Sequence, residues 1–194
     1  YEKTLPKINQ FIFEIFALYS VLTIICAFLY FLSGMNGFDS IAHAMTTIST
    51  GGFSTHNKSF EFFNSISVES VGILFMIIGS LPFVVFLKFI HGEKKSIFKD
   101  DQIKLFISIL LILIIITAYW LHNNYFNNDI MHSIRLAAFN ITSILTGTGY
   151  TSYDYNLWGS FGLVIMIIIM FIGGCAGSTT CGIKIFRLQL LFRG

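Results

Sequence analysis

The sequence predicts an all-α membrane protein made of two repeats. Each repeat has a transmembrane helix, a re-entrant pore helix with a filter loop, and a second transmembrane helix, and the last helix is broken by a glycine-rich loop. Of the 194 residues, 55% are apolar and only 11% are charged, and the mean hydropathy is +0.75. A soluble domain has about 25% charged residues. The long apolar stretches also indicate a membrane protein, and a glycine-containing pattern that occurs twice indicates the two repeats.

Four apolar stretches are the candidate transmembrane helices. Three of them approach the roughly 20 residues that cross a bilayer as a helix: 8–32, 68–90 and 103–121. The fourth, 161–172, is too short alone and continues beyond the glycine-rich break into residues 183–192. Pro82 lies within the second stretch and is expected to bend that helix.

Two further segments, 38–49 and 130–145, are rich in Thr, Ser, Asn and His and are too weakly hydrophobic to span a membrane. Each ends in a tripeptide that contains glycine. Aligning Gly52 with Gly149 gives an offset of 97 residues, and the order hydroxyl, small, small, glycine, aromatic, hydroxyl then recurs. The sequence therefore predicts two repeats, residues 1–97 and 98–194, each with one re-entrant segment.

The basic residues predict how the chain is oriented. Only Lys58 and Arg135 lie near the re-entrant segments. The other ten lie on the opposite side: Lys3, Lys7, Lys88, Lys94, Lys95, Lys99, Lys104, Lys184, Arg187 and Arg193. The positive-inside rule then places both ends of the chain and its middle loop in the cytoplasm. We expect a multi-pass protein of the cytoplasmic (inner) membrane, and a net charge of +2 gives no sign of nucleic-acid binding.

The glycine tripeptides suit a dehydrated cation. A helix that ends inside the membrane leaves its last carbonyls unpaired and carries about half a negative charge there. Extended backbone with inward carbonyls can then replace the hydration shell of an ion. Phe53 and Tyr150 are expected to wedge the loops against neighbouring helices. The alternative is that the glycines form exposed turns, but two matching loops on the same side favour a filter.

A family resemblance rests on three motifs: STGGFST at 49–55, FNITSILTGTGY at 139–150 and GGCAGSTTCGIKIFR at 173–187. These resemble the Trk/Ktr/HKT superfamily of potassium and sodium transporters, and GSLPF at 79–83 also looks like this superfamily. The resemblance implies the second and third of four helix–pore-loop–helix repeats around one pore. The ion-binding residues that it implies are Thr50, Gly51, Gly52, Phe53, Gly147, Thr148, Gly149 and Tyr150.

The glycine-rich break, residues 173–182, has four glycines in ten residues. Each costs about 1 kcal/mol relative to alanine inside a helix, so the segment is expected to be unwound. The resemblance implies an intramembrane gating loop formed by Gly173, Gly174, Ala176, Gly177, Ser178, Thr179 and Gly182. A flexible kink for helix packing is the alternative. Residues 177–184 resemble the phosphate-binding loop motif. However, the lysine lies one residue further along the chain than the motif requires, and no strand precedes the segment.

These observations predict uptake of a monovalent cation through backbone carbonyls, with gating at the break. Potassium is favoured because the superfamily associates filter glycines with potassium, and both filter positions in this chain are glycine. No catalytic constellation is visible, so we expect neither an enzyme nor a cofactor, and K⁺ (or Na⁺) is only the transported ion. The resemblance implies three partners: the remaining two repeats of the same protein, a homodimer mate and a cytosolic nucleotide-binding regulatory subunit. The alternative function is a non-conducting membrane scaffold or assembly subunit.

Overall fold

A computed structural model describes residues 5–93, 95–126 and 129–193. Lys3 and Lys94, which support the predicted orientation, lie outside the described residues. The first repeat contains α1 (Leu5–Leu32), α2 (Gly37–Ile48), η1 (Ser59–Phe62), α3 (Ile66–Ser80) and α4 (Phe83–Ile90). A short helix, α5 (Ser96–Lys99), leads to the second repeat, which contains α6 (Asp101–Asn124), α7 (Ile130–Leu145), η2 (Tyr155–Trp158), α8 (Gly159–Met170) and α9 (Ile185–Arg193).

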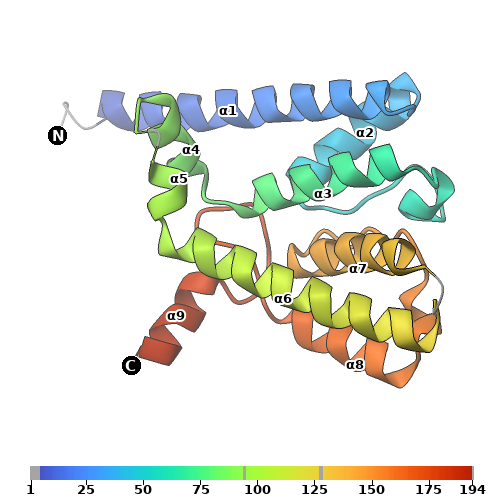
Figure 1. Ribbon diagram of the computed structural model, residues 1–194. Helices are drawn as coiled ribbons and strands as arrows, with labels where there is room; N and C mark the ends of the chain where they lie inside the picture. The colour runs from blue at the N-terminus through green and yellow to red at the C-terminus, as the bar shows by residue number, and fades with distance from the viewer. Residues whose placement is uncertain (1–4, 94, 127–128, 194) are drawn as a thin grey trace.

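Both repeats run through the same path in space. In Figure 1 the long helices α1 and α6 lead from left to right, the short helices α2 and α7 enter from the right, and α3 and α8 return toward the left. By length and composition α1 and α6 can each cross a membrane, and α3 with α4 forms a third, bent candidate span. The predicted fold class, an all-α membrane protein with helix–re-entrant helix–helix repeats, is confirmed.

The return path of the first repeat is sharply bent. The axes of α3 and α4 differ by 92° across a break at Leu81 and Pro82. Proline lacks an amide hydrogen and disfavours helical angles in the residue before it, and Leu81 is accordingly extended, with ψ of 155°. The bend predicted at Pro82 is present, and it divides the predicted span over 68–90 into two helices, α3 and α4.

The two repeats share a core. Tyr30, Phe60 and Met76 of the first repeat are fully buried, and they pack with Phe139 and Tyr150 of the second repeat in one apolar cluster. A second cluster lies among α6, α7 and α8. Side chains of the second repeat therefore complete the core of the first, so the halves form one packed unit.

A buried ion pair also joins the repeats. Arg135 of α7 donates from Nε to one carboxylate oxygen of Glu69 at 2.7 Å and from Nη2 to the other at 2.8 Å. The Glu69 side chain on α3 is 4% exposed, whereas Arg135 is 22% exposed. Such a bidentate pair fixes both distance and orientation, and it therefore sets how α3 lies against α7.

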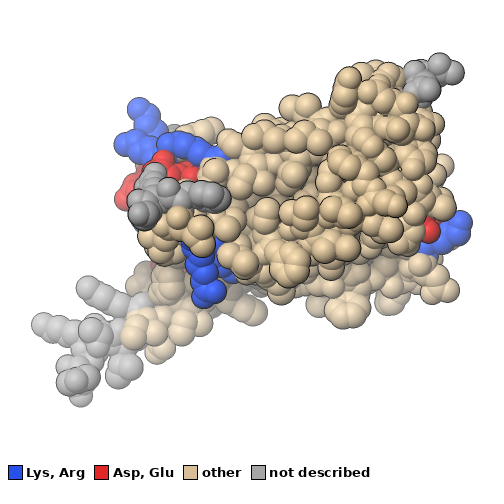
Figure 2. Space-filling view, turned by 90° about the horizontal axis from the view of Figure 1, so that it is seen from below, with Lys and Arg blue, Asp and Glu red and all other residues tan. Residues whose placement is uncertain are grey.

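On the face shown in Figure 2, the charged residues that the structure describes lie at the ends of the molecule. Figure 2 shows Lys and Arg gathered mainly at the end where α4 and α5 lie, with a broad uncharged surface beyond them. Large apolar side chains such as Phe13, Ile24 and Ile115 are exposed on α1 and α6. A wide apolar band between charged ends is the surface that a bilayer requires.

Candidate ion-binding site

The two glycine-containing segments form matching loops, which we call the first glycine loop (residues 49–54) and the second glycine loop (residues 146–151). Thr46 Oγ1 donates to the carbonyl of Phe53 at 2.8 Å, and Ser143 Oγ donates to the carbonyl of Tyr150 at 2.7 Å. Each hydroxyl lies on the last turn of a pore helix and reaches seven residues ahead. The 97-residue offset seen in the sequence therefore holds at the level of single hydrogen bonds.

Main-chain hydrogen bonds repeat at the same offset. The carbonyl of Thr46 accepts from the amide of Gly51 at 2.8 Å, and the carbonyl of Ser143 accepts from the amide of Thr148 at 2.9 Å. These bonds turn the chain back at the end of α2 and α7. The sequence alone did not single out Ser143, although its alignment with Thr46 was a signal that could have found it.

Backbone angles in both loops lie in the left-handed region at alternate residues. The values of φ are +51° at Thr50, +69° at Gly52, +72° at Gly147 and +86° at Gly149. Glycine adopts such angles at little cost, whereas a residue with a side chain pays roughly 1–2 kcal/mol. Thr50 is thus held in an unfavourable conformation by its surroundings.

The loops meet at Gly52. A β-carbon at this position would lie 1.8 Å from the Thr148 carbonyl oxygen and 3.6 Å from the Gly149 carbonyl carbon. Only a residue without a side chain allows the second loop to approach this closely. The structure therefore brings together the two glycines that the sequence singled out.

Several carbonyls in this region have no partner. Among the residues that the structure describes, no hydrogen bond is accepted by the main-chain oxygens of Thr50, Gly51, Gly52, Gly147, Thr148 or Gly149. Thr50 and Thr148 are only 5% and 4% exposed, whereas Gly51, Gly147 and Gly149 are exposed and Gly52 is half-buried. Buried carbonyls normally find a hydrogen-bond donor, so the free oxygens of Thr50 and Thr148 are suited to a cation or to its water.

The two loop aromatics differ. Tyr150 is fully buried, its ring centroid lies 4.5 Å from that of Phe60, and its hydroxyl lies 2.5 Å from Thr46 Oγ1. The predicted wedge is correct for Tyr150 but wrong for Phe53, which is 78% exposed. Tyr150 packs on α2, the pore helix of the preceding repeat, and no described helix occupies the corresponding place beside Phe53.

The glycine-rich break separates α8 from α9, as predicted. Ile172 and Ile183 form a parallel bridge that closes the segment at its base. A β-carbon at Gly173 would lie 2.0 Å from the carbonyl oxygen of Cys181, so glycine is required for this closure. A phosphate loop is not formed, because α8 rather than a strand precedes the break and Lys184 Nζ donates to the carbonyl of Thr180.

The break is seated against the bend between α3 and α4. The amide of Cys175 donates to the carbonyl of Ser80 at 3.0 Å, and the amide of Phe83 donates to the carbonyl of Gly177 at 3.0 Å. The amide of Ala176 donates to Gln102 Oε1 at 3.0 Å. The break at Pro82 leaves the carbonyl of Ser80 and the amide of Phe83 without partners within their helices. A segment of the other repeat supplies those hydrogen-bond partners.

Comparison with known proteins decides the family. The model of the family described as "TrkH: Cation transport protein" matches residues 2–194. This chain belongs to that family. The superfamily resemblance is therefore confirmed, as is the prediction that the protein is not an enzyme, because the family transports cations.

Individual relatives agree with this assignment. The Trk system potassium uptake protein TrkI of Halomonas elongata is 34% identical over 190 residues, which are 97% of this chain and 38% of that protein. TrkH of Escherichia coli K12 is 32% identical over 194 residues, covering 98% and 40%. The crystal structure of the potassium transporter TrkH from Vibrio parahaemolyticus has a TM-score of 0.91 at 34% identity, covering 96% of this chain and 41% of that one.

The chain thus spans about two fifths of the length of these relatives. The structural match extends over nearly all of the chain, so the fold described above is that of a contiguous part of a TrkH-type transporter.

Proposed function

We propose that this chain forms part of a potassium uptake pathway in the cytoplasmic membrane, with residues 1–97 and 98–194 as the second and third of four pore-lining repeats. The observation that carries the proposal is the meeting at Gly52 of two loops with unpaired carbonyls, two of which belong to the buried residues Thr50 and Thr148. The ion-binding residues are those of the two glycine loops: Thr50, Gly51, Gly52, Phe53, Gly147, Thr148, Gly149 and Tyr150. Phe53 and Tyr150 act only through the backbone.

Main-chain oxygens are the available ligands for the ion. Among the described residues no group of three His, Cys, Asp or Glu side chains is placed to hold a metal ion. Rings of carbonyl dipoles favour a weakly hydrated monovalent cation that must also leave again. The carboxyl ends of α2 and α7, which point at the two loops, add negative potential. The relatives from Halomonas elongata and Escherichia coli are named potassium uptake proteins, which favours K⁺ over Na⁺.

The glycine-rich break is the proposed gate, with Gly173, Gly174, Ala176, Gly177, Ser178, Thr179 and Gly182 as its residues. It lies next to the second glycine loop, since a β-carbon at Gly147 would be 3.6 Å from the amide nitrogen of Cys181. A cavity of about 270 Å³ borders both segments and is lined by Gly147, Gly149 and Cys181 among others. An ion that leaves the loops would therefore pass beside the break.

The concentration of basic residues around α4 and α5 supports a cytoplasmic location for that end (Figure 2). The pore helices α2 and α7 would then enter from outside. Passage follows the electrochemical gradient, and no cofactor takes part.

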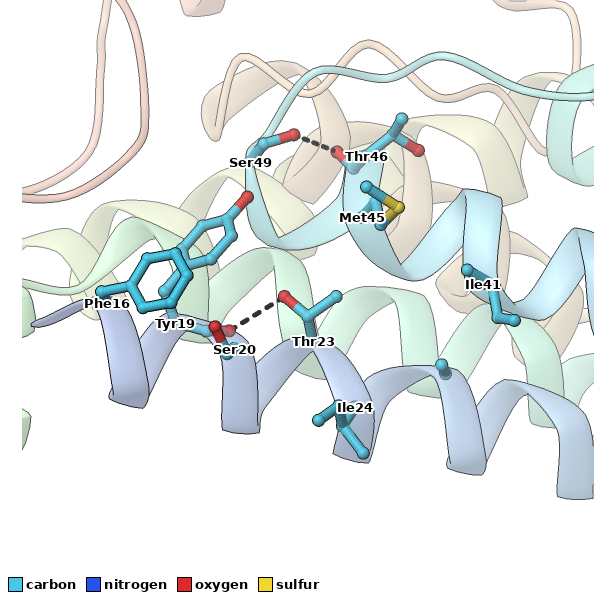
Figure 3. A pocket seen from close by; sticks show the side chains of 10 residues that line it. Phe16, Tyr19, Ser20, Thr23, Ile24, Ile41, Met45, Thr46 and Ser49 are labelled. Atoms are coloured by element: carbon cyan, nitrogen blue, oxygen red, sulfur yellow. Dashed lines mark hydrogen bonds between the residues drawn. The ribbon is translucent and has the colours of Figure 1, made fainter.

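A groove between α1 and α2 is the proposed binding surface for a helix of a further repeat. It measures about 810 Å³, and its wall includes Ile24, Met45, Thr46 and Ser49 (Figure 3). Met45 is 56% exposed, whereas the residue 97 positions later, Thr142, is fully buried in the pore helix on which α3 packs. Repeat symmetry therefore assigns the groove to the return helix of a neighbouring repeat and the place beside the exposed Phe53 to the pore helix of that repeat.

The remaining partners rest on the resemblance alone. They are a second copy that completes a dimer of pores and a cytosolic nucleotide-binding regulatory subunit.

Expression of the full-length protein in cells that lack potassium uptake tests the function. We expect growth at low external potassium and uptake of Rb⁺ in preference to Na⁺. A non-conducting scaffold would transport neither ion and leave growth unrescued even when the protein is present in the membrane, and that outcome would overturn the proposal. The matched control is Thr117→Val, which removes a buried hydroxyl that has no hydrogen-bond partner among the described residues and should behave as the wild type.

A further inference from the structure

Thr179 lies where the glycine-rich break meets the first repeat. Its Oγ1 is 3.0 Å from the carbonyl oxygen of Ile48 and 3.0 Å from that of Gly79. Its own amide donates to Gly79 at 3.2 Å. Its carbonyl accepts from Thr50 Oγ1 at 3.1 Å. One residue of the break thus contacts the end of α2, the end of α3 and the first glycine loop.

These partners are groups that a helix end leaves unsatisfied. Ile48 is the last residue of α2, and Gly79 is in the last turn of α3, before the bend at Pro82. Their carbonyls have no intrahelical donor, and the hydroxyl and amide of Thr179 supply one from the other repeat. A β-carbon at Gly79 would lie 3.1 Å from the Ile48 oxygen, so glycine permits the two helix ends to converge on Thr179.

Thr50 connects this contact to the unpaired carbonyls. It is the only residue with a side chain among the left-handed positions of the two described loops, and its strain must be offset by local interactions. Its hydroxyl lies 2.7 Å from the Ser49 carbonyl and 3.1 Å from the Thr179 carbonyl. If the break moved away, Thr50 would lose one of these two acceptors.

We propose that Thr179 holds the glycine-rich break against the first repeat and couples its position to the conformation of Thr50. Thr179 is a positioning residue: it acts on the ion path through Thr50. The inference rests on the proposed function, since it gives the gate a specific connection to the filter. Closure of the break would support the strained filter conformation, and movement of the break would relax it.

The test measures opening of the break directly, through Cys175. This thiol is fully buried at the seat on Ser80, so N-ethylmaleimide reaches it only when the break leaves the bend. In the full-length protein with all other cysteines replaced, we expect Thr179→Val to accelerate Cys175 labelling about 3–10-fold, the equivalent of one lost hydrogen bond. Thr179→Ser keeps the hydroxyl and should label within about twofold of the parent rate, as should the control Thr117→Val.

Coupling to Thr50 is tested with the same readout. Thr50→Val should also accelerate labelling. The double variant should be accelerated by less than the product of the two single effects, because a break loosened by loss of the Thr179 hydroxyl no longer holds the Thr179 carbonyl firmly against Thr50. Rb⁺ over Na⁺ selectivity should fall in Thr179→Val and recover in Thr179→Ser.

The outcomes separate this inference from the proposed function. Unchanged labelling in Thr179→Val overturns the role of Thr179 even if transport is normal, and multiplicative effects in the double variant overturn the coupling. If the full-length protein transports no cation but labelling changes as expected, the proposed function fails while the contact between the break and the first repeat stands.

Discussion

Replacing Gly52 with alanine is expected to reduce Rb⁺ uptake by the full-length protein about 100-fold, the scale of loss that a misplacement of about 1 Å produces at a site requiring exact geometry. The added β-carbon would lie 1.8 Å from the carbonyl oxygen of Thr148. Because that oxygen belongs to the backbone, the clash cannot be relieved by a change of rotamer, and the second glycine loop must shift. Initial rates of Rb⁺ uptake in deficient cells measure the effect.

Gly149→Ala is the matched control. Gly149 also has a positive φ, +86°, but a β-carbon added there would have no neighbouring atom of the described residues within 4 Å and would meet open space. Gly149→Ala therefore introduces only a backbone strain of roughly 1–2 kcal/mol, and the rate of Rb⁺ uptake should fall by about 10-fold. Equal effects of the two substitutions would show that the contact between Gly52 and Thr148 does not matter for transport.

Arg135→Met is expected to be the most destabilising substitution outside the glycine loops. It leaves the buried carboxylate of Glu69 without its bidentate partner, at a cost of about 3 kcal/mol. We expect the temperature of unfolding in detergent to fall by about 5–10 °C. A fluorescence or light-scattering melt of the purified protein measures this change.

Two variants sharpen that experiment. Glu69→Gln combined with Arg135→Met removes both charges and should recover most of the lost stability. Lys58→Met removes one partner of an ion pair in which Lys58 is 70% exposed, and it should change the free energy of unfolding by less than about 1 kcal/mol. If Arg135→Met behaves like Lys58→Met, the pair does not hold α3 against α7.

Much of the fold could be predicted because its causes are local. Apolar runs of membrane length define α1 and α6, Pro82 ends α3, and four glycines in ten residues prevent a continuous last helix. The spacing of Gly52 and Gly149 likewise revealed the repeat. Each of these features follows from the residue types in a short stretch of chain.

The rest depends on contacts between distant segments. His43 and Asn140 occupy matching positions and bond to the carbonyls four residues earlier, at 2.8 and 2.9 Å, although one is an imidazole and the other an amide. The repeat is thus preserved as a hydrogen-bond pattern rather than as identity. The exposure of Phe53 and the contacts of Thr179 depend on which helices lie next to one another, and composition does not specify that.

The central claim is that main-chain oxygens of the two glycine loops hold a dehydrated potassium ion. Anomalous diffraction from crystals of the full-length protein grown with Rb⁺ or Tl⁺ tests it most directly. We predict an anomalous peak within coordination distance of the carbonyls of Thr50, Gly51, Gly147 and Thr148. Peaks confined to carboxylates at the outer surface, with none between Gly52 and Gly149, would contradict it.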